Sequence, residues 1–180
     1  MTFQTFSTKY SVAGLLGISG IALSSLVPGG PIETRSFTHI HPLTLGIFNT
    51  FLTTLALGSL ILVYFVLKSE RWAMVGAALC GLSFFGVYVA DLAVIFPVSL
   101  DAMPPALLAI EIFGTLLSLP LMWFSAQAWQ TATQSTFISA NAPQIQTQKT
   151  SQIWQIFSGI VVGIVALSII IFATDAAMGL

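Results

Sequence analysis

Two carboxylic acids, Asp91 and Glu111, lie inside long apolar stretches of this sequence. An ionised group at the centre of a membrane helix costs roughly 3 kcal/mol or more, so such residues usually face a cavity or a partner. On a helix, Asp91 shares a face with Tyr88, and Glu111 shares a face with Thr115 and Ser118. We therefore expect one polar pocket that holds both acids.

This pair of acids allows two interpretations. Close carboxylates share a proton and titrate as a pair, which would suit a small proton- or cation-coupled carrier. In the structural alternative, the acids accept hydrogen bonds from a loop or pair with Arg35, which lies in a segment bounded by prolines, 28–42. We predict that this loop folds over the helices and places Arg35 near Asp91, Glu111 or both. The candidate pocket then consists of Arg35, Tyr88, Asp91 and Glu111.

A second set of candidates is the pair His39 and His41, just before the second apolar stretch. Alternate side chains of an extended segment point the same way, so both imidazoles could meet one metal ion together with Glu33 or Asp101. This interpretation implies a metal-dependent membrane enzyme. A solvated histidine, or one that caps a helix, gives the same pattern without any chemistry.

The composition indicates which class of protein must position these residues. Hydrophobic residues make up 56% of the 180 and charged residues only 6%, with a mean hydropathy of +0.96. A soluble domain has about 25% charged residues, so this chain could not cover a surface that faces water. The net charge of -1 argues against nucleic-acid binding, and the single cysteine, Cys80, excludes an internal disulfide and a thiolate zinc site.

The sequence contains no motif of a common enzyme class. There is no GxSxG, Walker, GxGxxG or HExxH pattern. We therefore favour a protein that is not an enzyme, and no cofactor is indicated.

Five apolar runs are long enough to cross a bilayer, whose hydrocarbon core of roughly 30 Å needs about 20 helical residues. They cover residues 10–27, 43–67, 72–96, 104–127 and 154–173. The predicted fold is an all-α integral membrane protein. It consists of a four-helix transmembrane bundle (1–128), a flexible cytoplasmic linker rich in Gln, Thr and Ser (129–152), and an appended fifth transmembrane helix with a short outer tail (153–180).

The basic residues predict the orientation. With the N-terminus in the cytoplasm, Lys9, Lys68, Arg71 and Lys149 all lie on the cytoplasmic side and only Arg35 lies outside. Short cytoplasmic loops carry an excess of Lys and Arg, so this arrangement is favoured over its inverse. The C-terminus then lies on the opposite side of a bacterial-type inner membrane or another internal membrane.

Small residues on membrane helices allow close packing. The second run carries them at four-residue spacing, namely Gly46, Thr50, Thr54 and Gly58, and the fifth carries Gly159 and Gly163. For the second run we favour packing inside the bundle. For the fifth, contact with another membrane protein or a second copy of the chain is an equal alternative.

Together these features favour a non-catalytic role. The chain would be an accessory or assembly subunit, or a binder of an apolar ligand, surrounded by membrane lipid. A carrier that uses Asp91 and Glu111 is the first alternative, and a metal-dependent enzyme that uses His39 and His41 is the second.

Overall fold

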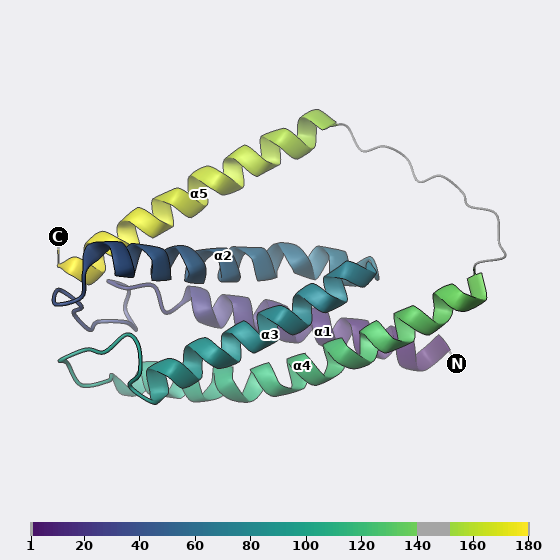
Figure 1. The fold of residues 1–180 in the computed structure, drawn as a ribbon, viewed down its shortest axis with the longest axis horizontal. Coiled ribbons are helices and arrows are strands. Elements are labelled where there is room, and N and C mark those ends of the chain that lie inside the picture. Colours follow the sequence, from purple (N-terminus) through teal and green to yellow (C-terminus); the bar gives the residue numbers. More distant parts are fainter. Residues whose placement is uncertain (1, 140–151, 180) are drawn as a thin grey trace.

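The computed structural model describes residues 2–139 and 152–179, with side chains for 8–130 and 163–179. This part of the chain is all-helical, and its helices are α1 (Thr2–Ser24), α2 (Pro42–Leu67), α3 (Arg71–Leu92), α4 (Pro105–Ser139) and α5 (Gln152–Met178) (Figure 1). Within the described residues, three segments are long and apolar enough to span a membrane: Pro42–Leu67, Arg71–Leu92 and Pro105–Gln130. The sequence correctly predicted the all-helical class.

The first four helices pack together as an antiparallel core, in which α1 contacts α2, α3 and α4, and α3 packs closely on α4. Among the helices of the described part, α5 packs against α2. The C-terminal end of α5 lies beside the start of α2, and the two helices diverge toward the N-terminal end of α5 (Figure 1). The two long loops, 25–41 and 93–104, lie at the same end of the core as the C-terminus, and we call this the loop end. The opposite end carries the turn 68–70, and we call it the turn end.

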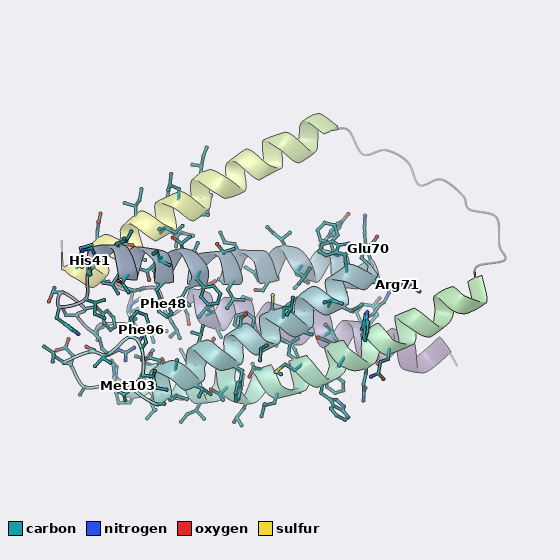
Figure 2. The ribbon with its side chains drawn as sticks, viewed as in Figure 1. His41, Phe48, Glu70, Arg71, Phe96 and Met103 are labelled. Atoms are coloured by element: carbon teal, nitrogen blue, oxygen red, sulfur yellow. The ribbon has the colours of Figure 1, made fainter. Side chains whose placement is uncertain are left out.

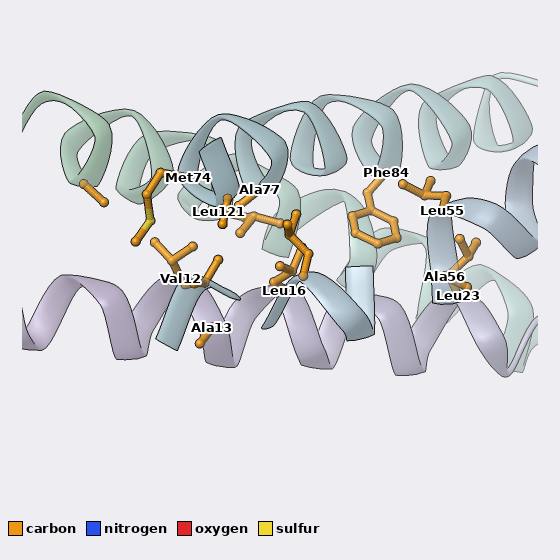
Figure 3. Packing of buried hydrophobic residues seen from close by; sticks show 14 of the residues in the cluster. Val12, Ala13, Leu16, Leu23, Leu55, Ala56, Met74, Ala77, Phe84 and Leu121 are labelled. Atoms are coloured by element: carbon orange, nitrogen blue, oxygen red, sulfur yellow. The ribbon is translucent and has the colours of Figure 1, made fainter. Parts of the chain in front are cut away.

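The core forms because buried residues recur every three or four positions. They include Ala77, Gly81, Phe84, Tyr88 and Asp91 on α3, and Leu107, Glu111, Gly114, Ser118 and Leu121 on α4. This spacing places one stripe of each helix against the other, as in ridge-into-groove packing. Figure 3 shows Phe84 and Leu121 beside Leu16 of α1 in this cluster. The same two stripes carry both candidate acids, so helix packing positions them.

The end of α3 differs from the predicted end near Phe96. The helix ends at Leu92, and the N–H of Val94 donates to the carbonyl of Asp91 while that of Ile95 donates to Ala90, each at 2.8 Å. This pair of hydrogen bonds is a Schellman cap, with Val94 in the left-handed region at φ 55°. Because of this cap, the chain leaves the helix axis about one turn after Asp91.

The fourth helix continues beyond the predicted end near Gln127, to Ser139. No Gly or Pro occurs between Ala128 and Ser139, so the backbone can keep its helical hydrogen bonds although the residues become polar. Part of the segment predicted as a linker is therefore helical. The remainder, 140–151, lies outside the described residues.

The stripe of small residues on α2 faces away from the core. Thr50, Thr54 and Gly58 are exposed, and nothing lies within 4 Å of the position that a Cβ would take at Gly46 or Gly58. The prediction that this stripe packs inside the bundle is wrong, because the buried face of α2 passes through neighbouring positions such as Asn49.

The small residues on α5 have no observed packing role. Nothing lies within 4 Å of a Cβ at Gly163, which is exposed, and Gly159 lies outside the residues whose side chains are described. The contact with another chain stays a prediction.

Gly114 offers a test of how α3 and α4 position Tyr88. A Cβ at Gly114 would overlap the Tyr88 ring, whereas nothing lies within 4 Å of a Cβ at Gly86, an exposed glycine of α3. We expect Gly114→Ala to lower the free energy of unfolding by about 1–3 kcal/mol through overpacking. The matched control, Gly86→Ala, should raise it by about 0.5–1 kcal/mol because alanine favours the helix. Both are measured by denaturant titration in detergent, and equal effects would contradict the packing.

Candidate functional site

The loop 25–41 contributes to the site through an extended segment whose alternate side chains point inward. Glu33, Arg35 and Phe37 are buried, whereas Thr34 and Ser36 between them are exposed. This is the period of two expected for extended backbone. A glutamate and an arginine two residues apart therefore enter the core from the same side.

Arg35 pairs with two carboxylates at once. Its Nη1 and Nη2 donate to Oδ1 and Oδ2 of Asp91 at 3.0 and 2.6 Å. Its Nε and Nη2 donate to Oε1 and Oε2 of Glu33 at 3.0 and 2.7 Å. Arg35, Glu33 and Asp91 are 6%, 4% and 8% exposed, so the whole group is removed from water. The contact that the sequence predicted between Arg35 and Asp91 is present.

The surroundings of Arg35 keep its guanidinium charged. Burial by itself would lower the pKa of Arg35, but the hydrogen bonds and negative charges of Glu33 and Asp91 outweigh it, so the pKa lies above its ordinary value. The guanidinium also lies 5.4 Å from the centre of the Phe37 ring. Arg35 thus acts as a permanent cation that fixes two anions.

The other two members of the candidate pocket, Tyr88 and Glu111, lie beside this group. Both line, together with Arg35 and Asp91, a cavity of about 40 Å³ at the loop end, which we call the polar pocket. The Tyr88 hydroxyl and Oε2 of Glu111 are buried and have no hydrogen-bond partner within the described residues. The structure therefore brings all four predicted residues to one pocket but leaves two of them unsatisfied.

Glu33 is the member that the sequence reasoning missed. The sequence suggested Glu33 only as a ligand to a metal ion, and the structure instead pairs it with Arg35. The alternation of Glu33, Arg35 and Phe37 with small polar residues was a signal that these three side chains share one face.

The two histidines are not gathered into a metal site. His41 precedes α2 and its Nδ1 accepts from the N–H of Leu43 at 3.2 Å, so it caps the helix (Figure 2). Asp101 accepts from the N–H of Ser36 at 2.8 Å. Within the part of the chain that the structure describes, no group of three His, Cys, Asp or Glu side chains could hold a metal ion.

A second and larger cavity adjoins the polar pocket. It measures about 300 Å³, lies between α1, α2 and α5, and is lined mostly by apolar side chains, and we call it the apolar cleft. The two cavities share one wall, formed by Leu23, Leu26, Pro28, Asn49 and Leu52. On the α5 side the cleft is bounded by Ser168, Ile169, Phe172 and Ala173.

Two polar contacts join the end of α5 to α2 and to the loop 25–41. The side-chain amide of Asn49 donates to Oγ1 of Thr174 at 3.3 Å, and the N–H of Phe37 donates to the carbonyl of Ala177 at 3.0 Å. Both contacts lie near the C-terminal end of α5, so the loop 25–41 and α2 hold that end in place.

One family matches the chain, over residues 8–153, and its description reads Domain of unknown function (DUF8051). The comparison with curated proteins found no match, and neither did the comparison with solved structures.

The pairing of Arg35 can be tested by removing its charge. Arg35→Met leaves two buried carboxylates without a cation, although Glu33 keeps the hydrogen bond from the backbone N–H at position 35, and we expect the change to lower the free energy of unfolding by about 3 kcal/mol. Adding Asp91→Leu should recover part of that loss, because the double variant buries one uncompensated charge fewer. The control is Lys68→Met at the exposed turn end, which should cost less than about 1 kcal/mol. Equal losses for Arg35→Met and Lys68→Met, measured in the same detergent, would show that the pairing contributes nothing.

Proposed function

We propose a function from the geometry of the site. The chain belongs to the family described as Domain of unknown function (DUF8051), and that description names no activity. The proposal is that the chain crosses a membrane five times and binds an apolar ligand without catalysing a reaction. The observation that carries it is the apolar cleft of about 300 Å³ between α1, α2 and α5. Its volume falls at the lower end of the range of small-molecule sites.

The membrane location is supported by the outer surface of the helices. Large apolar side chains are exposed on every helix whose side chains are described, for example Ile21, Ile47, Leu79, Leu116 and Ile171. A water-soluble protein rarely exposes an apolar surface of this extent, whereas lipid tails would cover it without cost.

The proposed orientation has the turn end in the cytoplasm. Exposed tyrosine and tryptophan side chains gather toward that end of the core, namely Tyr10, Tyr64, Trp72, Trp123 and Trp129. Tyrosine and tryptophan favour the interface between lipid and water, where one end of the ring meets apolar chains and the other meets water. The same end carries Lys9, Lys68 and Arg71, in keeping with the excess of basic residues in cytoplasmic loops.

The chemistry of the cleft favours binding over catalysis. Its walls are mainly aliphatic and aromatic, and its polar members are Ser24, Asn49, Thr53 and Ser168. None of these has the nucleophile–base or metal-ligand arrangement that catalysis needs. An alkyl chain is the ligand that such a lining solvates best.

A proton- or cation-coupled carrier is the second proposal. The buried Oε2 of Glu111, which has no partner among the described residues, favours it. Both oxygens of Asp91 accept from Arg35, which leaves Asp91 less available to an incoming ion. We therefore rank the carrier below the ligand binder.

The orientation can be tested by labelling single cysteines with a membrane-impermeant reagent on intact cells. In a Cys80→Ala background, we expect Ala102→Cys at the loop end to be labelled and Ser69→Cys at the turn end to remain unlabelled. Both positions are exposed, and both should react once the cells are permeabilised. The reverse pattern on intact cells would overturn the proposed topology.

Ligand binding can be tested with a photoactivatable methyl ester of an 18-carbon fatty acid that carries a diazirine in its chain. We expect it to label peptides from α1, α2 and α5 around the cleft in the purified full-length protein. Ala173→Trp should lower that labelling by about tenfold, because the indole fills the space that the chain would occupy. Leu167→Trp, on an exposed face of the same helix, is the matched control. Labelling spread evenly over the outer surface, and unchanged by Ala173→Trp, would argue against the cleft as a binding site.

A further inference from the structure

The polar pocket beside the apolar cleft contains two buried polar atoms without a hydrogen-bond partner in the described part of the chain, although the carboxyl group of Glu111 also interacts with that of Asp91. They are the hydroxyl of Tyr88 and Oε2 of Glu111, on residues that are 1% and 2% exposed. Buried polar groups in proteins nearly always have a hydrogen-bond partner, so two exceptions in one pocket require a reason. The two residues come from facing positions of α3 and α4, which makes their proximity a consequence of the core packing.

The position of these atoms relative to the cleft suggests that reason. The polar pocket and the apolar cleft share a wall that includes Leu23, Asn49 and Leu52. The two cavities are therefore adjacent, and a chain in the cleft would have to pass between these shared side chains to place its end group in the polar pocket. With about 40 Å³ available, the pocket has room for a group equal in size to roughly two or three water molecules.

We propose that the ligand of the apolar cleft is a lipid alcohol drawn from the surrounding membrane, whose hydroxyl lies between Tyr88 and Glu111. The hydroxyl donates its hydrogen to Oε2 of Glu111 and accepts a hydrogen bond from the Tyr88 hydroxyl. One group satisfies both atoms because a hydroxyl is a donor and an acceptor at once. This inference rests on the proposed function and adds the class of head group.

The charges and hydrogen-bonding groups of the pocket together decide against other head groups. Among the described residues that line the pocket, Arg35 supplies the guanidinium, which already faces two carboxylates, and Glu111 adds a third carboxyl group. A phosphate or carboxylate head would therefore meet an excess of acidic groups with no cation left to bind it. The excess of acidic groups would attract an ammonium head, but an ammonium accepts no hydrogen bond, so the Tyr88 hydroxyl would stay unpaired.

The experiment compares ligands that share one 18-carbon chain and differ only in the head. The probes are oleyl alcohol, its methyl ether, oleylamine and oleate, titrated against the purified full-length protein in detergent and followed by native mass spectrometry. We expect the alcohol to bind about tenfold more tightly than the ether, which lacks the donor, and more tightly still than oleate.

Two variants connect this preference to the pocket. Tyr88→Phe keeps the ring that packs against Gly114 and removes only the hydroxyl, and Glu111→Met removes both carboxyl oxygens. In each, the alcohol should lose most of its advantage over the ether. Tyr88→Phe should also unfold at the same or a higher temperature than the wild type when no ligand is present, because it deletes an unsatisfied buried group. Tyr64→Phe, exposed at the turn end, should leave the preference unchanged.

The outcomes separate the two proposals. If the ether binds as tightly as the alcohol, and Ala173→Trp weakens both, the cleft binds a chain but the hydroxyl inference is wrong. If oleate or oleylamine binds most tightly, the class of head group is wrong. If no probe binds, the proposed function fails and this inference fails with it.

Discussion

The guanidinium of Arg35 connects the elements of the loop end. It reaches from an extended loop to the last turn of α3, and it places two carboxylates on one cation, out of water. A single buried acid in this position would be costly, and so would a single buried base. Because each group compensates the others, the loop 25–41 can cover the core instead of extending into solvent. The loop in turn contacts the end of α5, where the N–H of Phe37 donates to the carbonyl of Ala177.

The same pairing explains why the acids of the pocket have unequal roles. Asp91 uses both oxygens on Arg35, so it is a structural residue in this arrangement. Glu111 lines the same cavity, but its Oε2 has no partner among the described residues. Two acids that looked equivalent in the sequence are thus distinguished by one arginine.

Much of this arrangement followed from the sequence, and the parts that did not have identifiable causes. Long apolar runs predicted the helices, and the scarcity of basic residues near Asp91 predicted its pairing with Arg35. Hydropathy reports where lipid-compatible residues stop, not where helical hydrogen bonds stop, so α4 was predicted too short. The four-residue spacing that includes Thr50 and Thr54 defined a face of α2 correctly, but spacing does not say whether a face turns inward. The cleft depends on the tilt of α5 against α2, which no local pattern contains.

The unsatisfied atoms of the pocket have an energetic consequence for the protein without a ligand. Each buried polar group without a hydrogen bond costs about 1–3 kcal/mol, and Tyr88 and Glu111 contribute one each. A folded domain has a total stability of only about 5–15 kcal/mol, so two such groups are a considerable fraction of it. A ligand that satisfies both atoms and binds only the folded chain offsets this cost by mass action. The folded protein is therefore least stable when no ligand satisfies these two atoms. That is the arrangement expected where a ligand, rather than the chain itself, completes the packing.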